Sequence, residues 1–92
     1  MIIPYDGKEI STQFIYFSAK WCSPCKTIAP VIEASQTVVT KIDVDEFPDK
    51  AVEYGIIGIP TIVDIRDSER IAGGQTASIV FNFLKRNPEC TE

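Results

Sequence analysis

A run of strand-forming residues that leads directly into a helix-forming pattern most constrains the fold of this chain. Residues 14–17 are all aromatic or β-branched, which is typical of a strand buried on both faces. From Cys22 to about Ser35 apolar side chains recur at helical spacing, and Pro24 stands where a first helical turn accepts proline. The sequence therefore predicts that Cys22 lies at the corner between a buried strand and a helix.

Further strands and helices follow in alternation. Residues 37–45 predict a second strand, and residues 48–54 predict a short helix that ends at Gly55. This order indicates a parallel βαβ unit with a right-handed crossover, which puts Cys22 at the carboxyl end of a strand. The remaining expected elements are a strand over residues 61–66, a hairpin partner over residues 70–72 and an amphipathic helix over residues 76–86. We expect one α/β domain over residues 1–92, with a central mixed sheet flanked by helices.

Charge and cysteine usage exclude several classes of function. The net charge is -4 and no basic cluster is present, so the attraction that dominates nucleic-acid binding is missing. No apolar stretch is long enough to cross a membrane, and the amino terminus does not resemble a secretory signal. Cysteines at positions 22, 25 and 90 cannot form a secreted framework of several disulfides. The chain is therefore expected to be cytoplasmic and to bind neither nucleic acid nor membranes.

The lack of histidine narrows the chemistry that the chain can perform. Histidine is the commonest general base and the commonest metal ligand, and none is present. Mechanisms built on a Ser-His-Asp or Cys-His arrangement are excluded, together with most zinc hydrolases. Any reaction must therefore depend on thiols, carboxylates or lysines.

The two cysteines that lie three positions apart meet the requirements of disulfide exchange. A helix start favours the thiolate, because the helix dipole and free backbone N–H groups lower the pKa of a thiol there, and this predicts Cys22 as the nucleophile. Cys25 can reach a mixed disulfide at Cys22 and resolve it. We expect Cys22 to be accessible beside an exposed Trp21, and Cys25 to be the more buried of the two cysteines.

Two other interpretations of the cysteines remain open. A structural zinc ion or iron–sulfur cluster needs four ligands, and only Cys90 is left to add to the pair. The pair can also be structural, although a preceding buried strand and Trp21 make the context specific. Cys90 is interpreted as an incidental thiol in a frayed tail. We expect no metal and no organic cofactor.

Several segments resemble the thioredoxin family, and the similarity extends over residues 14–84. Residues 19–26 are similar to the family's Trp-Cys-Gly-Pro-Cys-Lys active site, with Ser23 in place of glycine. Residues 41–45 resemble its central strand, and residues 54–61 resemble its second signature, in which the Ile-Pro bond is cis. The chain is accordingly identified as a small member of this family, of a size that suits a phage or prokaryotic protein.

The resemblance implies a fold, an activity and a set of partners. It implies a monomeric thiol–disulfide oxidoreductase that reduces protein disulfides, such as those of ribonucleotide reductase, and is reduced by a thioredoxin-reductase-like donor. The redox group is a Cys22–Cys25 disulfide. An extended substrate segment binds to the backbone of Ile59. The implied docking groove consists of Trp21, Gly58, Ile59, Pro60 and one of Gly73 and Gly74, of which Gly74 is our choice.

The chain departs from the family at its proton-transfer group and at its amino terminus. Tyr16 stands where the family carries a buried aspartate that serves the resolving cysteine, and a phenol cannot replace a carboxylate base. Lys41, water or Asp64 are the alternatives, with Asp64 the weakest because a carboxylate in a short strand usually faces solvent. Only about 13 residues precede the first clear strand, so an abbreviated edge strand at residues 2–3 and little or no helix are expected there.

Two alternative functions remain open at this stage. A glutaredoxin-like, glutathione-dependent reductase is favoured by the short amino terminus and disfavoured by Trp21. A thioredoxin-fold binding subunit would use the surface around Trp21 and Pro60 without any redox change. Glutathione-dependent turnover, or binding that survives the loss of both cysteines, would distinguish these alternatives.

Overall fold

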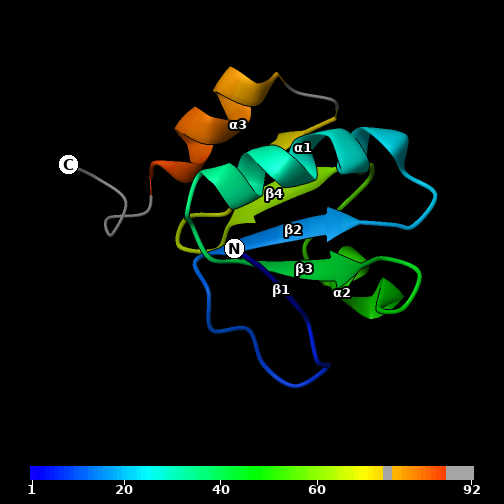
Figure 1. Ribbon diagram of the computed structural model, residues 1–92. Helices are drawn as coiled ribbons and strands as arrows, with labels where there is room; N and C mark the ends of the chain where they lie inside the picture. Colours follow the sequence, from blue (N-terminus) through cyan, green and yellow to red (C-terminus); the bar gives the residue numbers. More distant parts are fainter. Residues whose placement is uncertain (74–75, 87–92) are drawn as a thin grey trace.

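The computed structural model describes residues 1–73 and 76–86, and the strands and helices follow one another much as the sequence predicts (Figure 1). Gly74 and Cys90 lie outside the described residues. The elements in chain order are β1 (Ile2–Pro4), β2 (Phe14–Ser18), α1 (Ser23–Ala34), β3 (Val39–Asp43), α2 (Pro48–Glu53), β4 (Thr61–Asp64), β5 (Glu69–Ala72) and α3 (Ala77–Leu84).

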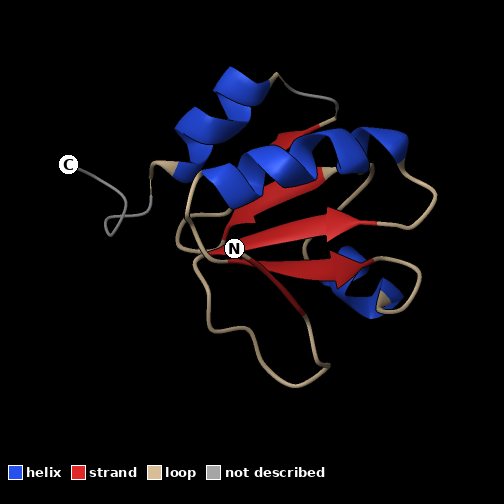
Figure 2. Cartoon of the chain, viewed as in Figure 1, coloured by secondary structure: helices blue, strands red, loops and turns tan. Residues whose placement is uncertain are grey.

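The five strands form one mixed sheet in the order β1-β3-β2-β4-β5. β3 pairs in parallel with both β1 and β2, whereas β4 pairs antiparallel with β2 and with β5. Helices α1 and α3 cover one face of the sheet and α2 lies on the other (Figure 2). The prediction of a central mixed sheet flanked by helices is confirmed.

The central strand β2 explains how one short segment serves both halves of the core. Its alternate side chains point to opposite faces of the sheet, and both faces are covered, so all five of its residues are buried. Phe14 and Tyr16 pack towards α1 and α3, and Ile15 and Phe17 pack towards the side that holds α2. Packing on both faces therefore holds β2 in place up to its last residue, Ser18. The turn into α1 begins at this fixed end of the strand.

The segment between β1 and β2 is a loop, and the expected edge strand at residues 2–3 is present. β1 has three residues, and in this described part of the chain residues 5–13 form no helix. Tyr5 and Ile10 instead pack against the core on the α2 side, with the Tyr5 ring edge-on to Phe47 at a centroid distance of 4.8 Å. This loop thus covers part of the core on the α2 side.

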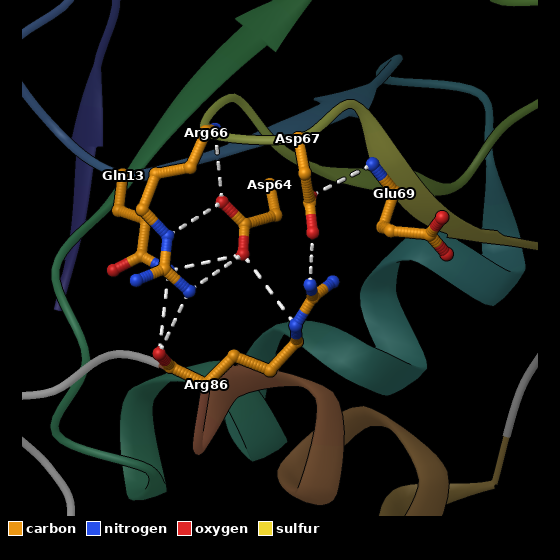
Figure 3. Close-up of polar contacts among 6 residues, drawn as sticks. All are labelled: Gln13, Asp64, Arg66, Asp67, Glu69 and Arg86. Atoms are coloured by element: carbon orange, nitrogen blue, oxygen red, sulfur yellow. Dashed lines mark hydrogen bonds and ion pairs between the residues drawn. The ribbon is translucent and has the colours of Figure 1, made fainter.

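A buried carboxylate joins several elements at the end of the sheet where β2 begins (Figure 3). The side chain of Asp64, at the end of β4, is 0% exposed and accepts hydrogen bonds from Gln13 Nε2 at 3.0 Å and Arg66 Nη2 at 3.2 Å. Arg86, which follows α3, places its Nε 3.6 Å from the same carboxylate and pairs with Asp67. The network ties β4, the β4–β5 turn and the end of α3 together.

Candidate active site

A disulfide joins Cys22 and Cys25 at the start of α1, with the two Cα atoms 5.3 Å apart. Cys22 is the N-cap residue of the helix, and its Sγ accepts a hydrogen bond from the backbone N–H of Cys25 at 3.2 Å. A side-chain acceptor at this position satisfies one of the N–H groups that a helix start leaves free. The same N–H group can stabilise negative charge on the Cys22 sulfur when the disulfide is reduced.

The turn between β2 and α1 determines where this sulfur lies. The backbone N–H of Cys22 donates to Ala19 O at 3.2 Å, and proline occupies the first turn of the helix that follows. No acidic side chain of the described residues stands in that first turn. The positive end of the α1 dipole is therefore not offset by a carboxylate, which favours the thiolate form of Cys22.

The expected difference in burial between the two cysteines is wrong for this oxidised form. Cys22 and Cys25 are each 3% exposed, so Cys22 is not accessible and Cys25 is not the more buried. The disulfide holds Cys22 against the first turn of α1, and both sulfurs belong to the core cluster on the α1 side. Trp21, by contrast, is 68% exposed beside them, as expected.

A mainly apolar groove of about 420 Å³ is lined by Trp21, the residue that precedes Cys22, and by other predicted docking residues. Trp21, Gly58 and Ile59 line it together. The Ile59–Pro60 peptide bond is cis, as the resemblance implies. Sequence reasoning missed four other lining residues, which are Val44, Ala51, Ile56 and Ile57. The two isoleucines, which directly follow the glycine that ends a helix, were an available signal.

Hydrogen bonds hold Trp21 of this groove and the loop that carries the cis bond. The Trp21 indole N–H donates to Asp45 Oδ2 at 2.9 Å, so the exposed ring has a defined position. Next to Ile59, Pro60 O accepts a hydrogen bond from Gly73 N–H at 2.8 Å. Gly73, the alternative to Gly74, therefore lies beside the loop that carries the cis bond. Asp45 is a positioning residue that sequence reasoning did not identify.

Tyr16 contacts the backbone of Cys25 and not the Cys25 sulfur. Its hydroxyl donates to the carbonyl oxygen of Cys25 at 2.7 Å, and burial raises the pKa of Tyr16 to about 12. A phenol with that pKa stays protonated at neutral pH and cannot accept a proton from a thiol. Lys41 pairs with Tyr16 across β2 and β3, and both line a cavity that Cys25 also borders.

Asp64 does not belong to this site, and both expectations for it are wrong. In the β2–β4 register it lies opposite Phe14, whereas Thr61 lies opposite Phe17 near the disulfide. Three residues of strand correspond to about 10 Å, which places Asp64 at the far end of the sheet. It is buried instead of solvent-facing, because Arg66, Arg86 and Gln13 surround its charge, and two of these are distant in the sequence.

Removing the exposed indole is expected to weaken the docking of protein substrates without impairing the thiol chemistry. For a Trp21→Ala variant, KM for a protein disulfide should rise about tenfold with little change in kcat, because large aromatic anchors dominate such interfaces. The rate with a small aromatic disulfide reagent serves as the control and should change less than twofold. An unchanged KM for the protein substrate would show that Trp21 does not contribute to substrate binding.

Among the described residues, no three histidine, cysteine, aspartate or glutamate side chains are grouped so that they could hold a metal ion. In residues 1–73 and 76–86, no helix is both long enough and apolar enough to cross a bilayer.

Comparisons with known proteins agree on one family. The model of the thioredoxin family matches residues 7–86. A thioredoxin of Staphylococcus aureus is 38% identical, over 73% of this chain and 71% of that protein. Among solved structures, a mutant thioredoxin from Halobacterium salinarum is 35% identical with a TM-score of 0.68, covering 79% of this chain and 71% of that chain. The thioredoxin of Fasciola hepatica is 31% identical with a TM-score of 0.68, covering 79% of this chain and 77% of that chain.

Taken with the disulfide at the start of α1, these similarities show that the chain belongs to the thioredoxin family and is a protein-disulfide oxidoreductase.

Proposed function

We propose that Cys22 is the attacking thiolate and Cys25 the resolving thiol in the reduction of protein disulfides. The observation that carries the proposal is the position of the Cys22 sulfur at the start of α1, where it accepts a hydrogen bond from the backbone N–H of Cys25 and directly follows the groove residue Trp21. A sulfur held in this way is ionised more readily than a free thiol, whose pKa is about 8.5. Cys25 lies one helical turn away, within disulfide-forming distance.

The reaction then has two steps that balance in atoms and electrons. The Cys22 thiolate attacks one sulfur of the substrate disulfide and forms a mixed disulfide, and the other substrate sulfur leaves as a thiolate that takes up a proton. Cys25 loses its proton and attacks Cys22, which releases the second substrate sulfur as a thiol. Two electrons pass to the substrate and the Cys22–Cys25 disulfide is restored. No metal or organic cofactor is needed, because the two sulfurs carry both electrons.

The groove supports recognition of an extended segment on one side of the substrate disulfide. Trp21 provides an apolar surface, and the loop at Gly58, Ile59 and Pro60 provides backbone groups for a short β-type pairing. An added Cβ at Gly58 would meet nothing within 4 Å, so this part of the groove wall is open to an incoming chain. We propose these residues, with Gly73 or Gly74, as the substrate-binding set.

The partners and the location follow from the same proposal. A monomer in the cytoplasm would receive electrons from a thioredoxin-reductase-like donor and pass them to enzymes that form disulfides in turnover, of which ribonucleotide reductase is one example by family resemblance. The net charge of -4 and the lack of a basic cluster argue against nucleic-acid partners.

Reduction of insulin disulfides tests the proposed function. With dithiothreitol as the electron source, a catalytic amount of the protein should accelerate the precipitation of the insulin B chain well above the rate with dithiothreitol alone. Replacing dithiothreitol by glutathione and glutathione reductase should give little turnover, since that system supports a glutaredoxin-like reductase. Activity that depends on glutathione would overturn the proposal in favour of that alternative.

A further inference from the structure

A second cavity, separate from the docking groove, borders the resolving cysteine. It has a volume of about 670 Å³ and lies between the sheet and α1. Its floor consists of Pro4, Lys41 and Tyr16, which are neighbours across β1, β3 and β2. Its roof is the face of α1 that carries Cys25 and Glu33. The cavity therefore borders Cys25 through residues that the groove lining does not include.

The hydroxyl of Ser18 is the unexplained group in the wall of this cavity. Ser18 ends β2 and points to the same face as Tyr16, two residues earlier. The residue is 1% exposed, and within residues 1–73 and 76–86 its Oγ is the buried side-chain oxygen or nitrogen that has no hydrogen-bond partner. Buried hydroxyls nearly always pair with protein or with ordered water, and a cavity of this size, whose lining includes lysine side chains, has room for water.

Resolution of the mixed disulfide creates a need for a proton acceptor at this place. Only a thiolate attacks a disulfide, so Cys25 must lose its proton in the second step. The Tyr16 hydroxyl cannot take it, because its hydrogen is donated to Cys25 O at 2.7 Å and burial raises its pKa to about 12. A different acceptor must therefore lie on the cavity side of Cys25.

The charged groups around the cavity do not offer a base. Three of them are cations, and the carboxylate Glu33 is paired with the amino terminus at 3.6 Å. Glu33 also lies eight residues along α1 from Cys25, which corresponds to about 12 Å of helix. An ammonium group accepts no proton, so water is left as the acceptor. The three cations are Lys20, Lys26 and Lys41.

We propose that Ser18 is a positioning residue whose hydroxyl holds a water molecule in this cavity, and that this water takes the proton of Cys25 during resolution. The inference rests on the proposed function. The proton moves from Cys25 Sγ to the water and leaves through the cavity. The new thiolate forms the S–S bond to Cys22 while the bond from Cys22 to the substrate sulfur breaks, and the departing substrate thiolate takes up a proton from solvent.

Single-turnover kinetics with Ellman's reagent separate the two steps. In a Cys90→Ser background, the reduced protein releases one coloured thiolate when Cys22 attacks and a second when Cys25 resolves the mixed disulfide. For Ser18→Ala the second phase should slow about tenfold, and its pH midpoint should rise by about one unit, because the thiolate loses a hydrogen-bonded partner. The first phase should stay unchanged.

Ser18→Thr is the matched control, because it keeps the hydroxyl and adds a methyl group to the cavity. Its second phase should stay within about twofold of the unsubstituted rate, and thermal melts should show that both variants are folded. An unchanged second phase in Ser18→Ala, or an equal loss in Ser18→Thr, would overturn the role of the hydroxyl. Failure of the proposed function would appear differently, as the lack of two phases in the protein with Ser18 intact.

Discussion

A Cys22→Ser variant is expected to lose at least about a thousandfold of its disulfide-reductase activity. A serine hydroxyl is not ionised at neutral pH, so the helix start that stabilises a thiolate at position 22 has no nucleophile to act on. The core should tolerate the change, because serine is slightly smaller than cysteine and is a preferred N-cap residue. The measurement is the initial rate of insulin reduction with dithiothreitol as the electron source.

Cys90→Ser provides the matched control for this result. It makes the same chemical change at the third cysteine, which the sequence analysis interprets as incidental, and it should retain full activity. A Cys22→Ser protein that keeps its activity, or a Cys90→Ser protein that loses it, would assign the chemistry to a different sulfur.

The second large effect concerns stability and arises at the opposite end of the sheet. Asp64→Asn removes a fully buried negative charge that Arg66 and Arg86 surround. Breaking a buried ion pair typically costs about 3–5 kcal/mol, and because the two arginines are partly exposed we expect about 2 kcal/mol here. For a domain of this size that loss lowers Tm by about 10 °C. Asp67→Asn, at an exposed partner of Arg86, should cost less than about 1 kcal/mol.

The same carboxylate predicts how stability depends on pH. Burial acts to raise the pKa of Asp64, but hydrogen bonds from Arg66 and Gln13 and the charge of Arg66 outweigh it, so the pKa is lowered. A carboxyl whose pKa is lower in the folded state than in the unfolded state stabilises the folded state. This stabilisation is fully present at pH values above the pKa of the carboxyl in the unfolded chain, which is about 3.9. This contribution is lost as the pH falls through the folded-state pKa.

Urea denaturation at two pH values tests this dependence. The free energy of unfolding of the unsubstituted protein should exceed that of Asp64→Asn at pH 7, and the gap should narrow at pH 3. A gap that is the same at both pH values would mean that the Asp64 charge does not carry the stabilisation. At pH 7 the folded Asp64→Asn protein should have the same disulfide-reductase activity as the unsubstituted protein, since Asp64 is far from the disulfide.

The corner that carries the cysteines could be predicted from the sequence because its signals are local. A continuous aromatic and β-branched run specifies β2, and proline after Cys22 specifies the start of α1. The mixed sheet followed from the alternation of elements and from one hairpin. These features depend on neighbours within a few residues, which a linear sequence shows directly.

The features that could not be predicted depend on contacts between distant segments. Asp64 is buried because Gln13 and Arg86, 51 and 22 positions away, turn towards it, and no local pattern reveals this. The low exposure of Cys22 depends on the disulfide and on core residues from other elements. The cavity beside Ser18 exists only where β1, β3 and α1 meet, so its orphaned hydroxyl is visible only in the fold.

The most direct test of the central claim is to trap the intermediate that links the two cysteines. A Cys25→Ser variant in its reduced form is incubated with a protein disulfide, and the adduct is mapped by mass spectrometry after digestion without reductant. A stable mixed disulfide between substrate and Cys22 is the predicted result, because Cys22 can attack but nothing resolves the product. An adduct on Cys90, or no adduct while the protein with Cys25 intact remains active, would contradict the assignment of Cys22 as nucleophile and Cys25 as resolving thiol.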